Sequence, residues 1–139
     1  MRVVLDTNII LSSVSRYSPH KIIFDKFEQS KFMLCVTTEI LLEYEEKLSE
    51  NFNPALSELI ICAFVLKENV VFKEVYIRWN LLSKDADDNK FVDCAIASNA
   101  DYLVTNDKGF NILKNIPFPI IKIIKIEEFE KILLNVDAV

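Results

Sequence analysis

Short apolar runs alternate along this chain with longer stretches in which apolar residues recur at helical spacing. The first run, Val3 to Leu5, is continuous, as is typical of a strand that is buried on both faces in a parallel sheet. Further runs predict strands over residues 32–36, 70–72, 102–105 and 120–124. Strands that alternate with helices indicate a parallel sheet flanked by helices.

The intervening stretches have the start signals of helices. Ser18-Pro19 opens one pattern, Thr37 caps another, and Asp87 or Asp88 can cap a third over residues 89–98. Further helical patterns cover residues 54–66, a short amphipathic piece at 76–82, and residues 127–134. The chain shows no internal repeat or linker, so we expect a single domain over residues 1–139.

The stretch from Leu59 to Leu66 is apolar nearly all round its predicted helix. One core-facing stripe needs fewer apolar positions than this. Two interpretations stay open, a fully buried helix and a surface that binds a partner protein or a second copy of the chain. The residues that carry the second interpretation are Leu59, Ile60, Ile61, Phe64 and Val65.

Composition narrows the possible classes of protein. The longest apolar run is far shorter than the roughly 20 residues that span a bilayer, so we expect a cytosolic protein without a membrane segment. Gly109 is the only glycine, which excludes the glycine-rich loops that bind nucleotide phosphates. Cys35, Cys62 and Cys94 lie in apolar contexts that predict buried thiols. His20 is the only histidine, so catalysis would depend on carboxylates.

Four acidic residues are predicted to lie at one edge of the sheet. Asp6 and Asp107 follow strands, and Glu43 lies near the start of the helix after the second strand. Asp88 begins a helix that runs antiparallel to the strand after it. The N-terminus of this helix, and Asp88 with it, is therefore expected at the carboxyl edge of the sheet. Ligands of open α/β sheets bind there. Asp6 also has a simpler interpretation as a turn residue beside Thr7 and Asn8.

Four carboxylates without a matching set of Lys or Arg need a counter-charge. Two like charges 4 Å apart repel by about 4 kcal/mol at an effective dielectric of 20. Divalent cations would relieve this repulsion, and an oxygen-only ligand set favours Mg²⁺ or Mn²⁺. The four acids also account for most of the net charge of −5.

The same blocks of sequence resemble the PIN-domain family. The resemblance rests on Val-Leu-Asp-Thr-Asn at 4–8, Glu43, Asp-Asp-Asn-Lys-Phe-Val-Asp-Cys-Ala at 87–95 and Leu-Val-Thr-Asn-Asp at 103–107. It implies a three-layer α/β/α fold with a Rossmann-like parallel sheet. It is closest to VapC-like toxins of prokaryotic toxin–antitoxin pairs, which implies an RNA substrate, an antitoxin partner and a metal-dependent ribonuclease. Asp6, Glu43, Asp88 and Asp107 would then bind metal, supported by Asn8 and Thr105.

The third acid departs from the family pattern. Many members carry it at the position of Asn89, so Asp88 or Asp93 would have to serve here. We favour Asp88 because it stands at the start of its helix. Lys84, Lys90 and Lys108 lie near these blocks and could contact phosphates, although isolated lysines are commonly solvated surface charges.

Two other functions are considered. A haloacid-dehalogenase-like phosphatase also uses a strand-end Asp and Mg²⁺, but Asn8 stands where that family has its second Asp. A non-catalytic binding module on a PIN fold would be favoured only if the third acid were missing.

Overall fold

The computed structural model describes residues 1–136 and contains a five-stranded sheet. The strand order is β3-β2-β1-β4-β5, and all four strand pairs are parallel. The predicted parallel α/β fold is therefore confirmed. The strands are β1 (Arg2–Leu5), β2 (Met33–Val36), β3 (Val70–Phe72), β4 (Tyr102–Val104) and β5 (Ile123–Ile124).

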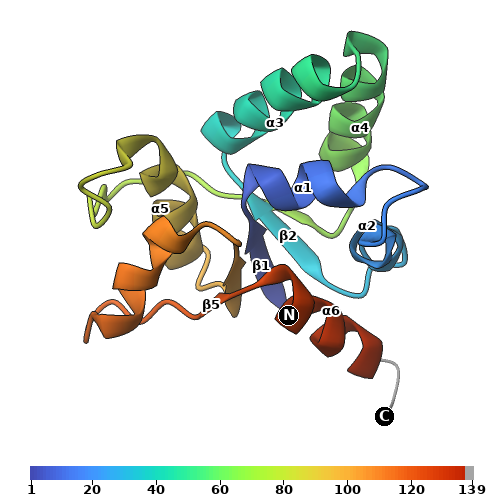
Figure 1. The fold of residues 1–139 in the computed structure, drawn as a ribbon. Coiled ribbons are helices and arrows are strands. Elements are labelled where there is room, and N and C mark those ends of the chain that lie inside the picture. Colours follow the sequence, from blue (N-terminus) through green and yellow to red (C-terminus); the bar gives the residue numbers. More distant parts are fainter. Residues whose placement is uncertain (137–139) are drawn as a thin grey trace.

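Helices cover both faces of the sheet. α5 packs against β1, β2 and β4, while α2 packs against α1 and α6. Figure 1 shows α5 on one side of the strands and α2, α4 and α6 on the other. The α-helices are α1 (Thr7–Ser13), α2 (Lys21–Glu28), α3 (Thr38–Asn51), α4 (Pro54–Leu66), α5 (Asn89–Ala97) and α6 (Ile126–Asn135), and two 3₁₀ helices are η1 (Ala86–Asp88) and η2 (Lys108–Asn115).

The centre of the sheet is fully buried. Val3, Val4 and Leu5 of β1 are at most 2% exposed, as their continuous apolar run predicts for a strand covered on both faces. Tyr44 of α3 is also buried, and its hydroxyl donates a hydrogen bond to the Leu5 carbonyl at 2.5 Å. This bond fixes α3 over the carboxyl end of β1.

Side-chain caps begin α3 and α4, and the cap at Thr37 is the one predicted from the sequence. The Thr37 hydroxyl accepts a hydrogen bond from the Ile40 N–H, and the Asn53 side chain accepts one from the Leu56 N–H. Pro54 follows as the first residue of α4, where its missing N–H is tolerated. Asp88, in contrast, makes no cap hydrogen bond at the start of α5, because η1 leads directly into that helix.

The short amphipathic piece predicted over residues 76–82 forms neither a helix nor a strand. This segment has no regular structure, because side chains of α5 bind its backbone. Asp93 accepts a hydrogen bond from the Trp79 N–H at 3.1 Å, and Asn89 bonds both the N–H and the carbonyl of Leu82. Asn80 between them has a φ of 51°, which interrupts a helix.

Two helices and one strand boundary also differ from the prediction. α1 begins directly after Asp6, whose carbonyl accepts the N–H of Ile9. η2 follows Asp107 in a stretch for which no element was predicted. The strand predicted over 120–124 is confined to Ile123–Ile124.

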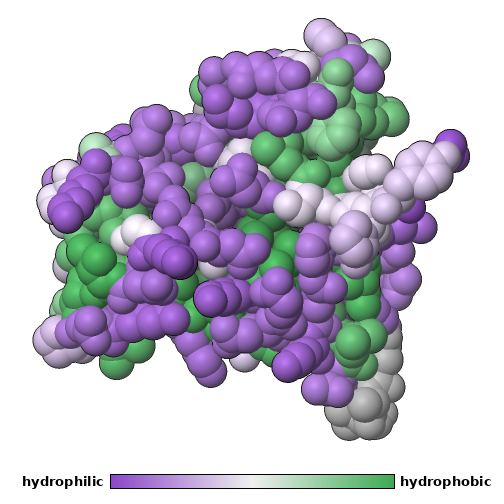
Figure 2. All heavy atoms as spheres, viewed as in Figure 1, coloured by the Kyte–Doolittle hydropathy of each residue, from purple (hydrophilic) through white to green (hydrophobic). Residues whose placement is uncertain are grey.

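The apolar helix α4 is only partly buried. Ile60 and Phe64 face the core at 6% and 1% exposure, whereas Leu59, Val65 and Leu66 are 68%, 53% and 82% exposed. Figure 2 shows apolar residues reaching the surface over α4. The interpretation of a fully buried helix is therefore wrong, and so is the predicted burial of Cys62, which is exposed on the same helix. Within residues 1–136, every helix is too short or too polar to span a membrane.

Candidate active site

The strand order places a crevice at the carboxyl ends of β1 and β4. The chain moves from β1 outward to β2 and β3, and then returns to build β4 and β5 on the other side of β1. Such a reversal in strand order marks the usual ligand site of an open α/β sheet. Asp6 follows β1 directly, and Asp107 lies three residues beyond β4.

Asp6 is a nearly buried carboxylate at 6% exposure. Its Oδ2 accepts a hydrogen bond from the Thr105 hydroxyl at 2.7 Å. Burial raises the pKa of Asp6, and the charges of Glu43 and Asp107 add to that rise, although the bond from Thr105 opposes it. A buried acid among other acids is costly for the isolated fold, which distinguishes Asp6 from a simple turn residue.

Thr105 connects the two strand-end acids. Its hydroxyl, which donates to Asp6, also accepts the Asp107 N–H at 3.0 Å. Asp107 in turn accepts the Gly109 N–H through Oδ1 at 2.8 Å. A Cβ on Gly109 would lie 3.0 Å from Asp85 Oδ2 and 3.2 Å from Asp107 Oδ1. The only glycine of the chain therefore lets the backbone pass closely between two carboxylates.

Asp88 faces the same cluster from the start of α5. Partial burial is the largest cause of a rise in its pKa to about 6, and the charges of Asp6, Asp107, Asp85 and Glu43 supply the rest of that rise. Asp6, Glu43 and Asp107 come from three other segments of the chain, and Asp85 precedes η1, which contains Asp88. Asp85 was not singled out from the sequence, because one acid within an acidic connection gives no signal of its position.

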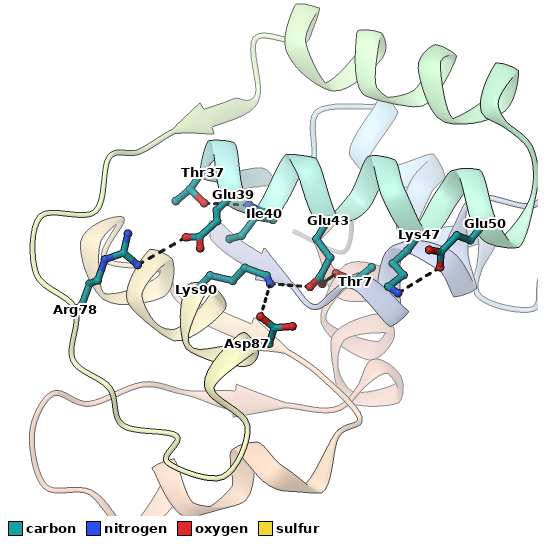
Figure 3. Close-up of polar contacts among 10 residues, drawn as sticks. All are labelled: Thr7, Thr37, Glu39, Ile40, Glu43, Lys47, Glu50, Arg78, Asp87 and Lys90. Carbon is teal, nitrogen blue, oxygen red and sulfur yellow. Dashed lines mark hydrogen bonds and ion pairs between the residues drawn. The ribbon is translucent and has the colours of Figure 1, made fainter.

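Glu43 belongs to the cluster but is held differently from the aspartates. Its Oε2 accepts a hydrogen bond from the Thr7 hydroxyl, and its Oε1 lies 2.7 Å from the ammonium of Lys90 (Figure 3). The expectation that the acids lack a matching cation is therefore wrong for Glu43. Thr7 and Lys90 acquire these roles only through the packing of α1 and α5 against α3.

A small cleft opens beside the two strand-end acids. It has a volume of about 270 Å³ and is lined by polar residues and Ile9. Asn8, predicted as a supporting residue, is exposed at this cleft. The cleft gives a solvent path to Asp6, which is otherwise nearly enclosed. Its lining consists of Asp6, Asn8, Ile9, Ser12, Asn106 and Asp107.

The alternative third acid, Asp93, lies outside this cluster. It is 3% exposed, binds the Trp79 N–H, and has Arg78 and Glu39 as its charged neighbours. Asn89, at the position where many family members carry the acid, is engaged with the backbone of Leu82. Of the residues considered for the third acid, Asp88 is the one whose carboxyl group is affected by the charges of Asp6 and Asp107.

The donor set fits a hard divalent cation by its chemistry, but it is not a finished cage. Among residues 1–136, no three acidic, histidine or cysteine side chains lie in an arrangement that could hold a metal ion as they stand. The predicted convergence is therefore looser than a coordination shell. Carboxylates that repel one another, with a pKa raised to about 6 at Asp88, are nevertheless groups that a cation would stabilise.

Comparison with known proteins identifies the family. Residues 2–109 match the model of the PIN domain, which covers more than half of the chain. The chain therefore belongs to the PIN domain family. No curated protein sequence matches it.

The fold also matches a solved structure. A chain in the crystal structure of VapBC2 from Rickettsia felis bound to a DNA fragment from their promoter superposes with a TM-score of 0.60 at 17% identity. The match covers 90% of this chain and 98% of that one. At this identity the likeness concerns the fold, and it confirms the predicted PIN-like α/β/α architecture. Membership of the PIN domain family removes the haloacid-dehalogenase-like alternative.

Proposed function

We propose that this protein is a metal-dependent endoribonuclease and the toxin of a toxin–antitoxin pair. One observation carries the proposal: the charges of Asp6, Asp88 and Asp107, which come from three separate segments of a PIN-domain fold, raise one another's cost at the switch point of the sheet. A fold alone does not define a reaction, but repelling acids beside an open cleft are an unfavourable arrangement unless they bind a cation.

Asp6, Asp88 and Asp107 would hold Mg²⁺ or Mn²⁺, with Glu43 beside them. Such an ion, when bound, lowers the pKa of a coordinated water and stabilises charge on a phosphodiester. The chain itself supplies orientation. The Thr105 hydroxyl donates a hydrogen bond to Asp6 and accepts one from the Asp107 N–H, so it links the two acids. The Tyr44 hydroxyl bonds the Leu5 carbonyl and so fixes α3 on the end of β1. Asn8 lies at the cleft, where it can contact the substrate.

The direct test is cleavage of single-stranded RNA by the purified chain. We expect cleavage in Mn²⁺ or Mg²⁺, no cleavage in EDTA, and recovery when the ion is restored. An Asp107→Asn variant, prepared in parallel, should lose activity and so exclude a contaminating nuclease. Absence of metal-dependent cleavage over a panel of structured and unstructured RNAs would favour a non-catalytic module on this fold.

The exposed side of α4 is the proposed antitoxin surface. Leu59, Val65 and Leu66 expose apolar side chains on one helix, and such a patch favours protein contact over solvent. The similar fold from Rickettsia felis occurs in VapBC2 bound to a DNA fragment. Co-expression with the product of the neighbouring reading frame should give a complex. Leu59→Glu should remove it while leaving a folded chain, whereas Ile60→Glu should unfold the chain because Ile60 is buried.

A further inference from the structure

Lys90 is a partly buried cation within the acidic site. Its side chain is 11% exposed, and its ammonium lies 2.7 Å from Glu43 Oε1 and 4.0 Å from Asp87 Oδ1. Glu43 is itself only 21% exposed. Figure 3 shows the lysine reaching from α5 to α3 between these two carboxylates. The ion pair therefore joins two helices at the edge of the cluster.

The Lys90–Glu43 pair differs from the surface ion pair within α3. Lys47 and Glu50 of α3 also pair, at 3.3 Å, but their side chains are 43% and 55% exposed. Exposed pairs of this kind contribute little to stability. A shielded pair is screened much less by solvent and salt, so the charge of Lys90 acts on Glu43 with little loss.

Both oxygens of Glu43 are already engaged. Thr7 donates to Oε2 and Lys90 contacts Oε1, so a metal ion could bind Glu43 only by displacing one of these groups. No comparable cation contacts Asp6 or Asp88, whose hydrogen bonds and charged neighbours within residues 1–136 come from hydroxyl, backbone and acidic groups. The cluster is therefore divided into a lysine-neutralised glutamate and a group of aspartates that lacks a cation.

We propose that Lys90 takes the place of a second metal ion, so that this site binds a single divalent cation, at Asp6, Asp88 and Asp107. Lys90 acts as a positioning residue: it neutralises Glu43 and keeps it from binding the ion. The inference rests on the proposed metal-dependent function. It explains why Glu43, although part of the cluster, is already occupied by groups of the chain itself.

The number of Mn²⁺ ions bound per chain tests this assignment. Isothermal titration should give one ion for the wild type. Lys90→Met retains the aliphatic stem but removes the charge, which frees Glu43 Oε1 and should allow a second ion to bind. Lys90→Arg keeps the charge and should again bind one. Lys47→Met removes an equal charge from the exposed Lys47–Glu50 pair of α3, the helix that carries Glu43, and should leave the stoichiometry at one.

The outcomes separate this inference from the proposed function. Two ions on the wild type together with Mn²⁺-dependent RNA cleavage would overturn the role of Lys90 and leave the nuclease proposal intact. One ion on both wild type and a folded Lys90→Met would also overturn it. Neither Mn²⁺ binding nor cleavage by the wild type would overturn both proposals. If Lys90→Met unfolds, Lys90→Leu takes its place, because it also removes the charge and leaves Glu43 Oε1 free, and it should bind two ions.

Discussion

Asp6 and Asp93 are two buried aspartates of similar exposure with different surroundings. They are 6% and 3% exposed, and burial raises the pKa of both carboxyl groups. Asp93 faces a backbone N–H and Arg78, and it holds residues 76–82 against α5. Asp6 faces Glu43 and Asp107, and it borders a cleft open to solvent. The two acids therefore differ in their neighbours more than in their burial.

This difference shows what distinguishes a candidate site acid from a structural one. A buried carboxylate that is bound to a donor and lies near a cation is satisfied by the protein itself. A buried carboxylate among other carboxylates is satisfied only in part, and the remainder of its stabilisation has to come from outside the chain. Raised pKa values alone do not separate the two cases, since Asp6 and Asp93 share that direction.

The largest contrast is expected in RNA cleavage. Asp6→Asn is nearly isosteric but removes a charge from the cluster, and kcat should fall by about 10² to 10³, the usual cost of one preorganised electrostatic group. Asp93→Asn keeps an acceptor for the Trp79 N–H and should leave cleavage unchanged. Initial rates with Mn²⁺ on both purified variants check this. Equal losses of cleavage rate in Asp6→Asn and Asp93→Asn would mean that the neighbours of a buried acid do not distinguish a site residue from a structural one.

The response of thermal stability to metal should differ in the same way. An ion that binds only the folded state at about 100 times its dissociation constant stabilises it by about 2.7 kcal/mol. Mn²⁺ should therefore raise the melting temperature of the wild type and of Asp93→Asn. Asp6→Asn should melt higher than the wild type in EDTA, because one repelling charge is gone, and should gain less from Mn²⁺. Calorimetry of the three proteins, with and without Mn²⁺, makes the measurement.

Removal of the Asp93 side chain should affect stability instead of chemistry. Asp93→Ala leaves the part-buried Trp79 N–H without its acceptor, which should cost about 1–3 kcal/mol of unfolding free energy. Cleavage per folded molecule should stay at the wild-type level. Urea denaturation monitored by the fluorescence of Trp79, the only tryptophan, reports the change directly. A folded Asp93→Ala that is inactive would reassign Asp93 to the site.

The smallest expected effect is the pH dependence that Asp88 gives to the metal-free protein. Its pKa rises from 3.8 to about 6 on folding, so protonated Asp88 favours the folded state. This contribution is fully present below pH 3.8 and is lost as pH rises through about 6. Between pH 3.8 and about pH 6, the melting temperature in EDTA should fall less steeply with rising pH for Asp88→Asn than for the wild type. Parallel curves would contradict the shift.

The sequence alone determined the sheet and the segments that carry the acids. Continuous apolar runs identify buried strands because both faces of a parallel sheet exclude water, and the runs at Val3 to Leu5 and Tyr102 to Val104 became β1 and β4. The order of strands and helices then places Asp6 and Asp107 at one edge. These are local patterns and chain-order rules, which a sequence displays directly.

Only the tertiary structure decided which polar groups meet. The structure engages Asp93 with the Trp79 N–H, whereas the charges near Asp88 are those of Asp6, Asp107, Asp85 and Glu43, and this contrast supports Asp88 as the proposed third acid. The pairing of Lys90 with Glu43 joins positions 47 residues apart, and no local pattern encodes such a contact. Side-chain partners across helices are set by packing of the whole core, and so the charge balance of the site became visible only after the chain was folded.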